Sequence, residues 1–212
     1  MKTAVIIPVK YLNDSKKRLA GILDLEKRRS LTELMLLDVL EAIAGSKSVS
    51  QTVLVSPDER VLKIGRKTGA ILLKESGSNG VNEAVAFATQ HCMQNGEQST
   101  LVLPADLPLL KPENIERIAG LGADHNAVIT PSRQEDGTNA LLRRPPDVMK
   151  TFYDNDSYRN HLLEANRLKI SIAKYLAPEV TLDIDSKADL QQFLKIAKKG
   201  RTLEYLSKPV LS

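Results

Sequence analysis

The sequence predicts an α/β fold in which helices cover both faces of a mainly parallel sheet. Short runs of β-branched and aliphatic residues alternate with amphipathic stretches of helical length along most of the chain. The chain has 212 residues, of which 42% are hydrophobic and 26% charged, as in ordinary globular domains. This alternation breaks between about residues 131 and 173. We therefore expect one three-layer α/β/α domain over residues 1–212, with a mixed-direction insertion at 131–173.

The first half of the chain contains four strand–helix units. Strands are expected at 3–9, 52–55, 70–73 and 100–103. The helices that follow them are expected from Asp24 or Ser30 to Ala44, from Ser56 to Lys67, from Val81 to about Met93 and from Pro112 to about Leu121. Ser30 and Glu33 form a candidate capping box, and Ser56 before Pro57 is a candidate N-cap. A flexible SGSNG loop at 76–80 precedes the third helix.

The second half is less regular. Strands are expected at 126–130 and 137–142, and Pro145 and Pro146 end the latter. A short helix begins at Ser157, an edge or hairpin strand covers 168–173, and VTLDID at 180–185 is interpreted as a last strand that ends in acids. An amphipathic helix is expected at 187–199, and the moderately apolar end of the chain is expected to pack on the domain or on a second copy.

Charge and composition restrict the possible partners. The net charge of +4 allows an anionic partner, either nucleic acid or a phosphorylated small molecule. Aromatic residues make up only 4% and Trp is absent, which disfavours single-stranded nucleic acid. No apolar run is long enough for a membrane span and no signal peptide is evident, so a soluble cytoplasmic protein without a membrane partner is expected. Cys92 is interpreted as a packed thiol, and three scattered histidines offer no zinc spacing.

The stretch LVLPADLP at 101–108 contains the first candidate functional residue. An aliphatic run ends at Asp106, and open α/β sheets bind ligands just beyond the carboxyl ends of their strands. Asp106 is thus either a ligand-binding acid or a residue that only forms the turn. Asp183 and Asp185 present the same choice, because either could cap the helix that follows them.

A cationic loop follows the first strand and contains Lys10, Lys16, Lys17 and Arg18. Composition alone favours a solvated surface loop, whereas its position favours a phosphate-binding loop. Acids at two strand ends together with this loop are the parts needed to hold a magnesium nucleoside triphosphate. Asn82, in the first turn of the third helix, is either a cap or a ligand contact.

Several mechanisms lack their motifs. There is no GxxxxGK sequence followed by Ser or Thr, so a P-loop mechanism is disfavoured, and there is no GxSxG elbow or Cys/His pair for acyl transfer. The remaining interpretation is transfer on a nucleotide held by a metal ion and basic side chains, without a covalent protein intermediate.

Six motifs together carry a resemblance to a known family. They are IIPVK with SKKRLA, GVNEA, LPADLP, DGTNALL, SYRNH and LDIDSKADL, in this order over residues 1 to about 195. The chain resembles the 2-phospho-L-lactate guanylyltransferase family, CofC, whose members have a nucleotide-diphospho-sugar transferase (GT-A-like) fold. The resemblance implies transfer of GMP from GTP to (2S)-2-phospholactate, which gives lactyl-2-diphospho-5′-guanosine and pyrophosphate in coenzyme F-420 biosynthesis.

The resemblance also implies roles for individual residues. Asp106 and Asp185, with Asp183 as an open alternative or addition, would bind Mg²⁺. Lys16, Arg18 and Asp106 would be catalytic. Nucleotide contacts would come from Pro8, Lys10, Lys16, Arg18, Ser56, Asn82 and Ala105. Thr138, Asn139 and Ser157 would hold the acceptor, and the helix start at Ser157 suits an anion on physical grounds as well.

Other readings are kept open. The acceptor could be phosphoenolpyruvate or 3-phosphoglycerate, because one methyl or methylene group is worth only ~1–3 kcal/mol in a pocket. Another nucleotidyltransferase, a GT-A glycosyltransferase, a catalytically dead regulatory member of the fold or a basic nucleic-acid-binding protein is less favoured. A homodimer is an expectation from the family.

Overall fold

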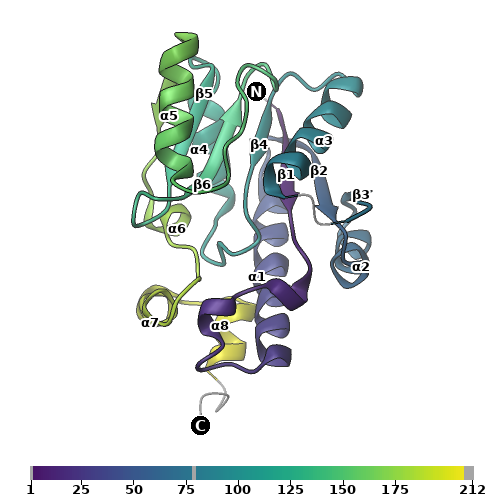
Figure 1. Ribbon diagram of the computed structural model, residues 1–212, viewed down its shortest axis with the longest axis vertical. Coiled ribbons are helices and arrows are strands. Elements are labelled where there is room, and N and C mark those ends of the chain that lie inside the picture. The colour runs from purple at the N-terminus through teal and green to yellow at the C-terminus, as the bar shows by residue number, and fades with distance from the viewer. Residues whose placement is uncertain (1, 78–79, 208–212) are drawn as a thin grey trace.

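The β-branched run at the start of the chain forms the centre of a mixed sheet. The computed structural model describes residues 2–77 and 80–207, and these contain one seven-stranded sheet in the order β3-β2-β1-β4-β6-β5-β7 (Figure 1). The strands are β1 (Thr3–Pro8), β2 (Val49–Ser56), β3 (Ile71–Lys74), β4 (Thr100–Val102), β5 (Ala127–Pro131), β6 (Thr138–Arg143) and β7 (Ile172–Lys174). Only β6 runs antiparallel to its neighbours β4 and β5. The predicted mainly parallel α/β fold is confirmed.

Helices cover both faces of this sheet, as the alternation of the first strand requires. The helices are α1 (Leu25–Gly45), α2 (Glu59–Lys67), α3 (Val81–Gln94), α4 (Pro112–Leu121), α5 (Ser157–Leu168), α6 (Pro178–Thr181), α7 (Lys187–Ile196) and α8 (Arg201–Leu206). Val5 and Ile7 of β1 join a core with α1, α2 and α4, whereas Ala4 and Ile6 face α3. All four side chains are fully buried, so β1 is packed on both faces between the two helical layers.

The reversed strand β6 brings the insertion to the site. In the register of β4 and β6, Thr100 lies opposite Arg143 and Val102 lies opposite Leu141. Because β6 is antiparallel, Thr138 at its start lies at the end of the sheet where the parallel strands have their C-termini. The insertion continues into α5, which packs through Tyr158 on Ile129 and Leu141.

A third cluster of apolar side chains lies beyond that edge. It joins the first half of α1, the segment 182–184, α7 and α8, and it includes Leu31, Leu182, Ile184 and Phe193. Figure 1 shows α8 beside the N-terminal half of α1 and α7 farther out, both away from the sheet. This cluster fixes the segment between α6 and α7 beneath the ends of the strands.

Several predicted boundaries are corrected. The longer helix from Asp24 is present, with the Asp24 carboxylate as N-cap, so Ser30 lies inside α1 and caps nothing. Asp58, not Ser56, caps α2, because Ser56 is still part of β2. Residues 180–185 form no strand: α6 ends at Thr181, and an extended segment follows that is not part of the sheet.

The end of the chain also differs from its prediction. The edge strand starts at Ile172, because α5 continues to Leu168, and α7 ends at Ile196 instead of residue 199. Of the terminal segment, α8 packs on the domain through Leu206 and through backbone amides of Arg201 and Thr202 that donate to Asp38. Residues 208–212, like positions 78–79 of the predicted 76–80 loop, lie outside the described residues. Among residues 2–77 and 80–207, no helix is long and apolar enough to cross a membrane.

Candidate active site

Three carboxylates converge at the end of β4. Asp106 lies in the turn after this strand, and Asp183 and Asp185 lie in the extended segment after α6. The backbone N–H of Ile184 donates to the Asp106 carbonyl at 3.2 Å, which joins the two segments. The Ile184 side chain is fully buried in the third cluster, so the acids on either side of it point the other way. One oxygen from each carboxylate lies within 4.8 Å of the others.

Lys16 bridges two of these acids. Its Nζ lies 2.5 Å from Asp106 Oδ2 and 2.6 Å from Asp185 Oδ1, and only 6% of its side chain is exposed. Lys16 adopts a left-handed backbone conformation with φ of 53° and ψ of 39°. Such a conformation costs a non-glycine residue roughly 1 kcal/mol or more. With this backbone conformation, the loop after β1 places the Lys16 ammonium group between Asp106 and Asp185.

The charges in this cluster perturb one another. Burial and the negative charge of Asp106 together raise the pKa of Asp183 to about 6, although the hydrogen bond from Asn139 opposes both. Burial alone would lower the pKa of Lys16, but Asp106 and Asp185 raise it well above the usual range. Lys16 is therefore always charged, and it compensates only part of the negative charge.

One carboxylate oxygen is left without compensation. Asp106 Oδ1 is buried and has no hydrogen-bond partner among the described residues. Together with Asp183 and Asp185, Asp106 offers a set of carboxylate oxygens. Hard oxygen donors of this kind are the ligands that divalent cations such as Mg²⁺ or Mn²⁺ prefer. The residues present thus fit a divalent metal ion at this place.

A neutral, buried hydrogen-bond network lies on the other side of the site. The Ser157 hydroxyl donates to Thr138 Oγ1 at 3.2 Å, and His161 Nδ1 lies 3.0 Å from the same oxygen. All three residues are buried, with 3%, 7% and 0% exposure for Ser157, Thr138 and His161. Burial and the charge of Arg143 lower the pKa of His161 to about 4, although a hydrogen bond with the Ser157 backbone opposes them. The imidazole is therefore neutral at physiological pH.

Asn139 connects the two sides. Its side-chain N–H groups donate to Asp183 Oδ1 at 3.0 Å and to the carbonyls of Val180 and Thr181. Because Asn139 follows Thr138 directly in β6, the strand start holds the hydroxyl network and an acid of the cluster at once.

Asn82 holds the segment between β6 and α5. Its Oδ1 accepts from the Tyr153 N–H at 2.8 Å, and its Nδ2 donates to the Asp154 carboxylate at 2.9 Å. Gly80, not Asn82, occupies the N-cap position of α3. The capping role considered for Asn82 is therefore wrong, and its side chain instead ties two parts of the site together.

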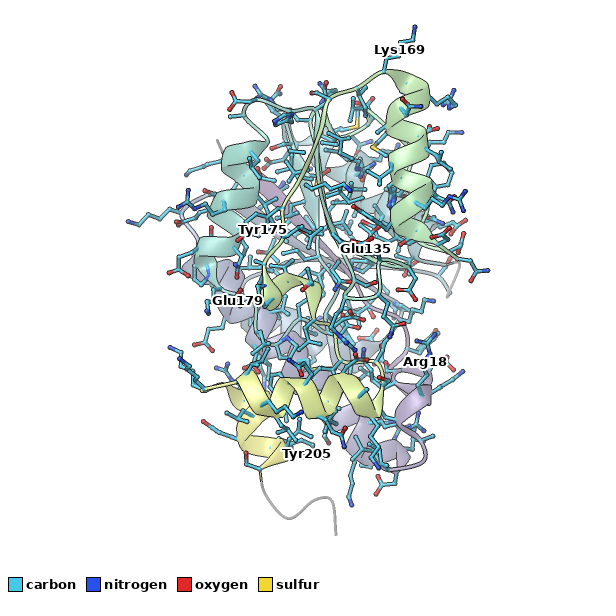
Figure 2. All side chains as sticks on the ribbon, turned by 90° about the vertical axis from the view of Figure 1, so that its left-hand side faces the viewer. Arg18, Glu135, Lys169, Tyr175, Glu179 and Tyr205 are labelled. Atoms are coloured by element: carbon cyan, nitrogen blue, oxygen red, sulfur yellow. The ribbon has the colours of Figure 1, made fainter. Side chains whose placement is uncertain are left out.

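The remaining predicted residues lie around this centre. Pro8 and Ser56 end adjacent strands β1 and β2, and buried Ala105 directly precedes Asp106. Lys10 and Arg18 are exposed, and Figure 2 shows Arg18 at the periphery of the molecule. The structure brings Lys16 to the acids but leaves Arg18 facing solvent.

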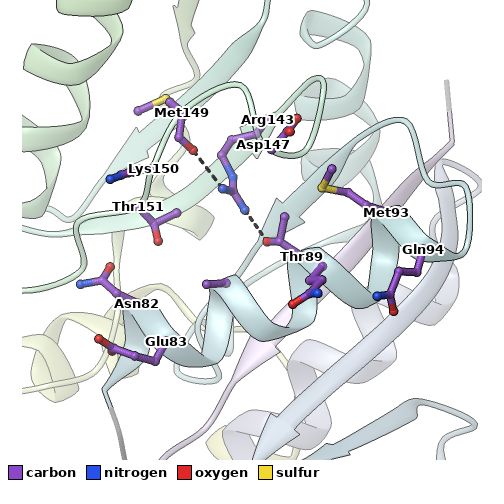
Figure 3. A pocket seen from close by; sticks show the side chains of 12 residues that line it. Asn82, Glu83, Thr89, Met93, Gln94, Arg143, Asp147, Met149, Lys150 and Thr151 are labelled. Carbon is purple, nitrogen blue, oxygen red and sulfur yellow. Dashed lines mark hydrogen bonds between the residues drawn. The ribbon is translucent and has the colours of Figure 1, made fainter.

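A hollow also lies apart from the acidic cluster. It is a groove of about 770 Å³ along α3 and the 147–151 segment (Figure 3). Arg143 is buried in its wall, where Nη1 donates to the Met149 carbonyl at 3.1 Å and Nη2 to Thr89 Oγ1 at 2.7 Å. Asn82 is the only predicted site residue that lines it. These bonds give Arg143 a structural role, in anchoring the 147–151 segment to α3.

His161 is the site residue that the sequence analysis missed. Its signal was the spacing of Ser157 and His161, four residues apart and hence on one face of a helix. Without the fold, nothing placed that face against Thr138, which lies 23 positions away from His161 in the chain.

Solved structures of similar fold define the class. A structure from Desulfovibrio desulfuricans G20, assigned to the nucleotide-diphospho-sugar transferases, superposes with a TM-score of 0.80 at 17% identity and covers 100% of this chain and 97% of that one. A CMP:2-keto-3-deoxy-manno-octonic acid synthetase in complex with CTP superposes with a TM-score of 0.61 at 13% identity, over 91% of this chain and 96% of that one. The fold is therefore that of the nucleotide-diphospho-sugar transferases, as the resemblance implied.

Sequence comparison defines the family within that class. The family described as guanylyl transferase CofC like matches residues 3–212, and the chain belongs to this family. Phosphoenolpyruvate guanylyltransferase of Conexibacter woesei is 35% identical over 95% of this chain and 91% of its own length, and that of Rubrobacter xylanophilus is 36% identical over 90% and 92%. The 2-phospho-L-lactate guanylyltransferase of Methanocaldococcus vulcanius is 34% identical over 95% and 89%.

Proposed function

We propose that this protein transfers the guanylyl group of GTP to (2S)-2-phospholactate and thereby forms lactyl-2-diphospho-5′-guanosine and pyrophosphate in coenzyme F-420 biosynthesis. The observation that carries this proposal is the placement of three carboxylates and Lys16 beside a buried hydroxyl pair at one edge of the sheet. The names of relatives that share about a third of their residues with this chain support it.

The proposed roles follow from charge and position. Asp106 and Asp185, with Asp183 beside them, hold Mg²⁺, which when bound neutralises triphosphate charge and favours departure of pyrophosphate. Lys16 is within reach of the same acids and turns to the phosphates when they arrive. The other proposed nucleotide contacts are Pro8, Lys10, Arg18, Ser56, Asn82 and Ala105. Thr138, Asn139 and Ser157 hold the phosphorylated acid.

No general base is needed in this reaction. A phosphate oxygen of the acceptor, already anionic at neutral pH, attacks the α-phosphorus of GTP, and the bond between the α-phosphorus and the bridging oxygen to the β-phosphate breaks. The protein contributes alignment of the two anions and neutralisation of their charge. Lys16 suits the second task because its pKa is raised and it does not lose its proton.

Phosphoenolpyruvate is the second candidate acceptor. Relatives from Sphaerobacter thermophilus, Conexibacter woesei and Rubrobacter xylanophilus, 30–36% identical to this chain, are named phosphoenolpyruvate guanylyltransferases. Both acids carry a phosphate and a carboxylate on the same carbon, and they differ by a methyl against a methylene group. That difference is worth only ~1–3 kcal/mol in a pocket.

A pyrophosphate-release assay tests the proposal. GTP, ATP, CTP and UTP are each paired with 2-phospholactate, phosphoenolpyruvate and 3-phosphoglycerate in the presence of Mg²⁺. We expect release with GTP and 2-phospholactate, and the rate with phosphoenolpyruvate decides between the two candidates. Absence of release with every pair would contradict the proposed reaction, and release with ATP alone would contradict the choice of base.

We also propose that residues 1–212 act as one nucleotidyltransferase domain, in which the insertion at about 131–173 shapes the acceptor site. The proposed assembly is a cytoplasmic homodimer that binds neither nucleic acid nor membrane. Light scattering after size-exclusion chromatography measures the oligomeric state, and a monomer mass would contradict the dimer.

A further inference from the structure

The buried imidazole of His161 has a defined proton. Its Nε2 lies 2.9 Å from the backbone nitrogen of Phe152, which can only donate. Nε2 must therefore accept, and in the neutral ring the proton is on Nδ1. Nδ1 carries the only ring proton and directs it to Thr138 Oγ1 at 3.0 Å, and the Ser157 backbone carbonyl shares the same proton.

This tautomer determines what the Thr138 hydroxyl can do. Thr138 Oγ1 has two lone pairs, and it accepts one hydrogen bond from His161 and one from the Ser157 hydroxyl. Both acceptor positions are filled, so the Thr138 proton is the only hydrogen-bonding capacity left. A hydroxyl in this state favours a ligand oxygen that accepts, such as that of a phosphate or carboxylate, over a ligand that donates.

His161 also holds the segment that crosses the site. The rings of Phe152 and Tyr153 pack edge-on against it, with centroid distances of 6.0 and 5.1 Å. The Tyr153 N–H in turn donates to Asn82 at the start of α3. A single fully buried side chain thus fixes the hydroxyl pair and the backbone next to it.

We infer that His161 is a positioning residue for acceptor recognition, which makes Thr138 an obligatory hydrogen-bond donor to an oxyanion of the phosphorylated acid. The inference rests on the proposed function for the identity of the ligand, but its geometry comes from His161 and its partners alone. His161 does not touch the reacting atoms in this scheme, and it acts through the hydroxyl pair.

Two substitutions separate the two bonds of the ring. In His161→Asn the amide nitrogen can replace Nδ1 as donor to Thr138, whereas the acceptor for the Phe152 N–H is lost. In His161→Gln the longer side chain can place its carbonyl oxygen near the Nε2 position, whereas the donor to Thr138 is lost. His91→Gln, a substitution on the last turn of α3 and outside the network, is the matched control. Circular dichroism and melting temperature establish that each variant is folded.

The measurements are KM for GTP, KM for each acid and the dissociation constants of 2-phospholactate and phosphoenolpyruvate by isothermal titration calorimetry. We expect His161→Gln to weaken acceptor binding about tenfold or more, as loss of a hydrogen bond to a charged group does. The KM for GTP should change less than about twofold, because Thr138 does not contact the nucleotide in this scheme. His161→Asn should restore most of the acceptor affinity.

Four outcomes would overturn the inference. These are unchanged acceptor affinity in His161→Gln, an equal rise of both KM values, equal effects of the two substitutions and no binding of either acid to the wild type. Binding of an acid without turnover in the wild type would contradict only the proposed reaction. In that case the ratio of dissociation constants between His161→Gln and His161→Asn still decides the role of His161.

Discussion

On the acidic side of the site, three carboxylates face one ammonium group and Asp106 Oδ1 has no partner among the described residues, whereas on the hydroxyl side Thr138 and Ser157 are already hydrogen-bonded. On the acidic side part of the negative charge is uncompensated, and we expect Lys16 to give up its acids when a cation binds. The hydroxyl side is held in place before any ligand arrives, and only the Thr138 proton is left to donate. One half of the site supplies charge and the other supplies fixed geometry.

The strongest test of this comparison removes a charge from the acidic side. Asp106→Asn should lower turnover by at least about 10³-fold, because the substitution removes a carboxylate from the cation site and from the Lys16 pair. The pyrophosphate-release rate measures the loss, and circular dichroism establishes that the variant is folded. Asp124→Asn, on the exposed loop after α4, is the control. A near-normal rate in Asp106→Asn would contradict the metal-binding role.

A second test concerns exchange of cations. Lys16→Met should lower kcat/KM for GTP about 10²-fold, because a buried charge that neutralises phosphate is lost. The same variant should bind Mn²⁺ more tightly than the wild type in the absence of nucleotide, since Lys16 no longer occupies the acids. Calorimetric titration with Mn²⁺ measures this gain. Lys17→Met, which removes an exposed lysine paired with Asp14, should change neither quantity. Weaker Mn²⁺ binding in Lys16→Met would show that no exchange occurs.

On the hydroxyl side, His161 should make the free energy of unfolding depend on pH. The pKa of His161 is lowered from 6.5 to about 4, so between these values the unfolded chain binds more protons than the folded one. Stability from this group is complete above pH 6.5 and is lost as pH falls toward 4, by ~2–3 kcal/mol. Urea unfolding at several pH values measures the slope. His161→Phe, which cannot titrate, should remove this part of the slope, and an unchanged slope would contradict the assignment.

The smallest expected effect is a gain in stability when Asp183 is replaced. Burial and the charge of Asp106 raise the pKa of Asp183 to about 6, so above that pH the folded protein carries a disfavoured charge. Asp183→Asn should therefore stabilise the metal-free protein by ~1 kcal/mol at pH 7.5. The gain should vanish near pH 3.5, where the carboxyl is protonated in both states. Thermal unfolding with a chelator present provides the measurement, and equal destabilisation at both pH values would contradict this account.

The sequence predicted the layers well because they depend on local pattern. The β-branched run at 3–9 and the alternation after it were sufficient for the parallel half, and the break near Thr130 did mark the reversed strand β6. Side-chain rules failed where two local solutions compete. Asp24 and Ser30 both fit a helix start, and the structure uses Asp24, whose carboxylate accepts from the Lys27 backbone N–H.

The sequence analysis named residues that the structure brings together, such as Asp106 and Lys16, but not the way in which the fold holds them. VTLDID has strand composition, yet it pairs with no strand of the sheet, and burial of Leu182 and Ile184 against α1 and α7 holds it as an extended segment. Lys16, which bridges two acids, has a left-handed backbone conformation. No glycine or asparagine at this position predicts that conformation from the sequence. His161 was missed because its partner Thr138 lies on β6, whereas His161 itself lies on α5.

The hydrogen bond from Ile184 to the Asp106 carbonyl also has a consequence for the order of events during synthesis. All seven strands precede residue 175, so the sheet can assemble while the segment with Asp183 and Asp185 is still to come. Until that segment docks, Lys16 and Asp106 face each other without their third partner. We therefore expect a nascent chain to acquire its core first and its affinity for a cation last.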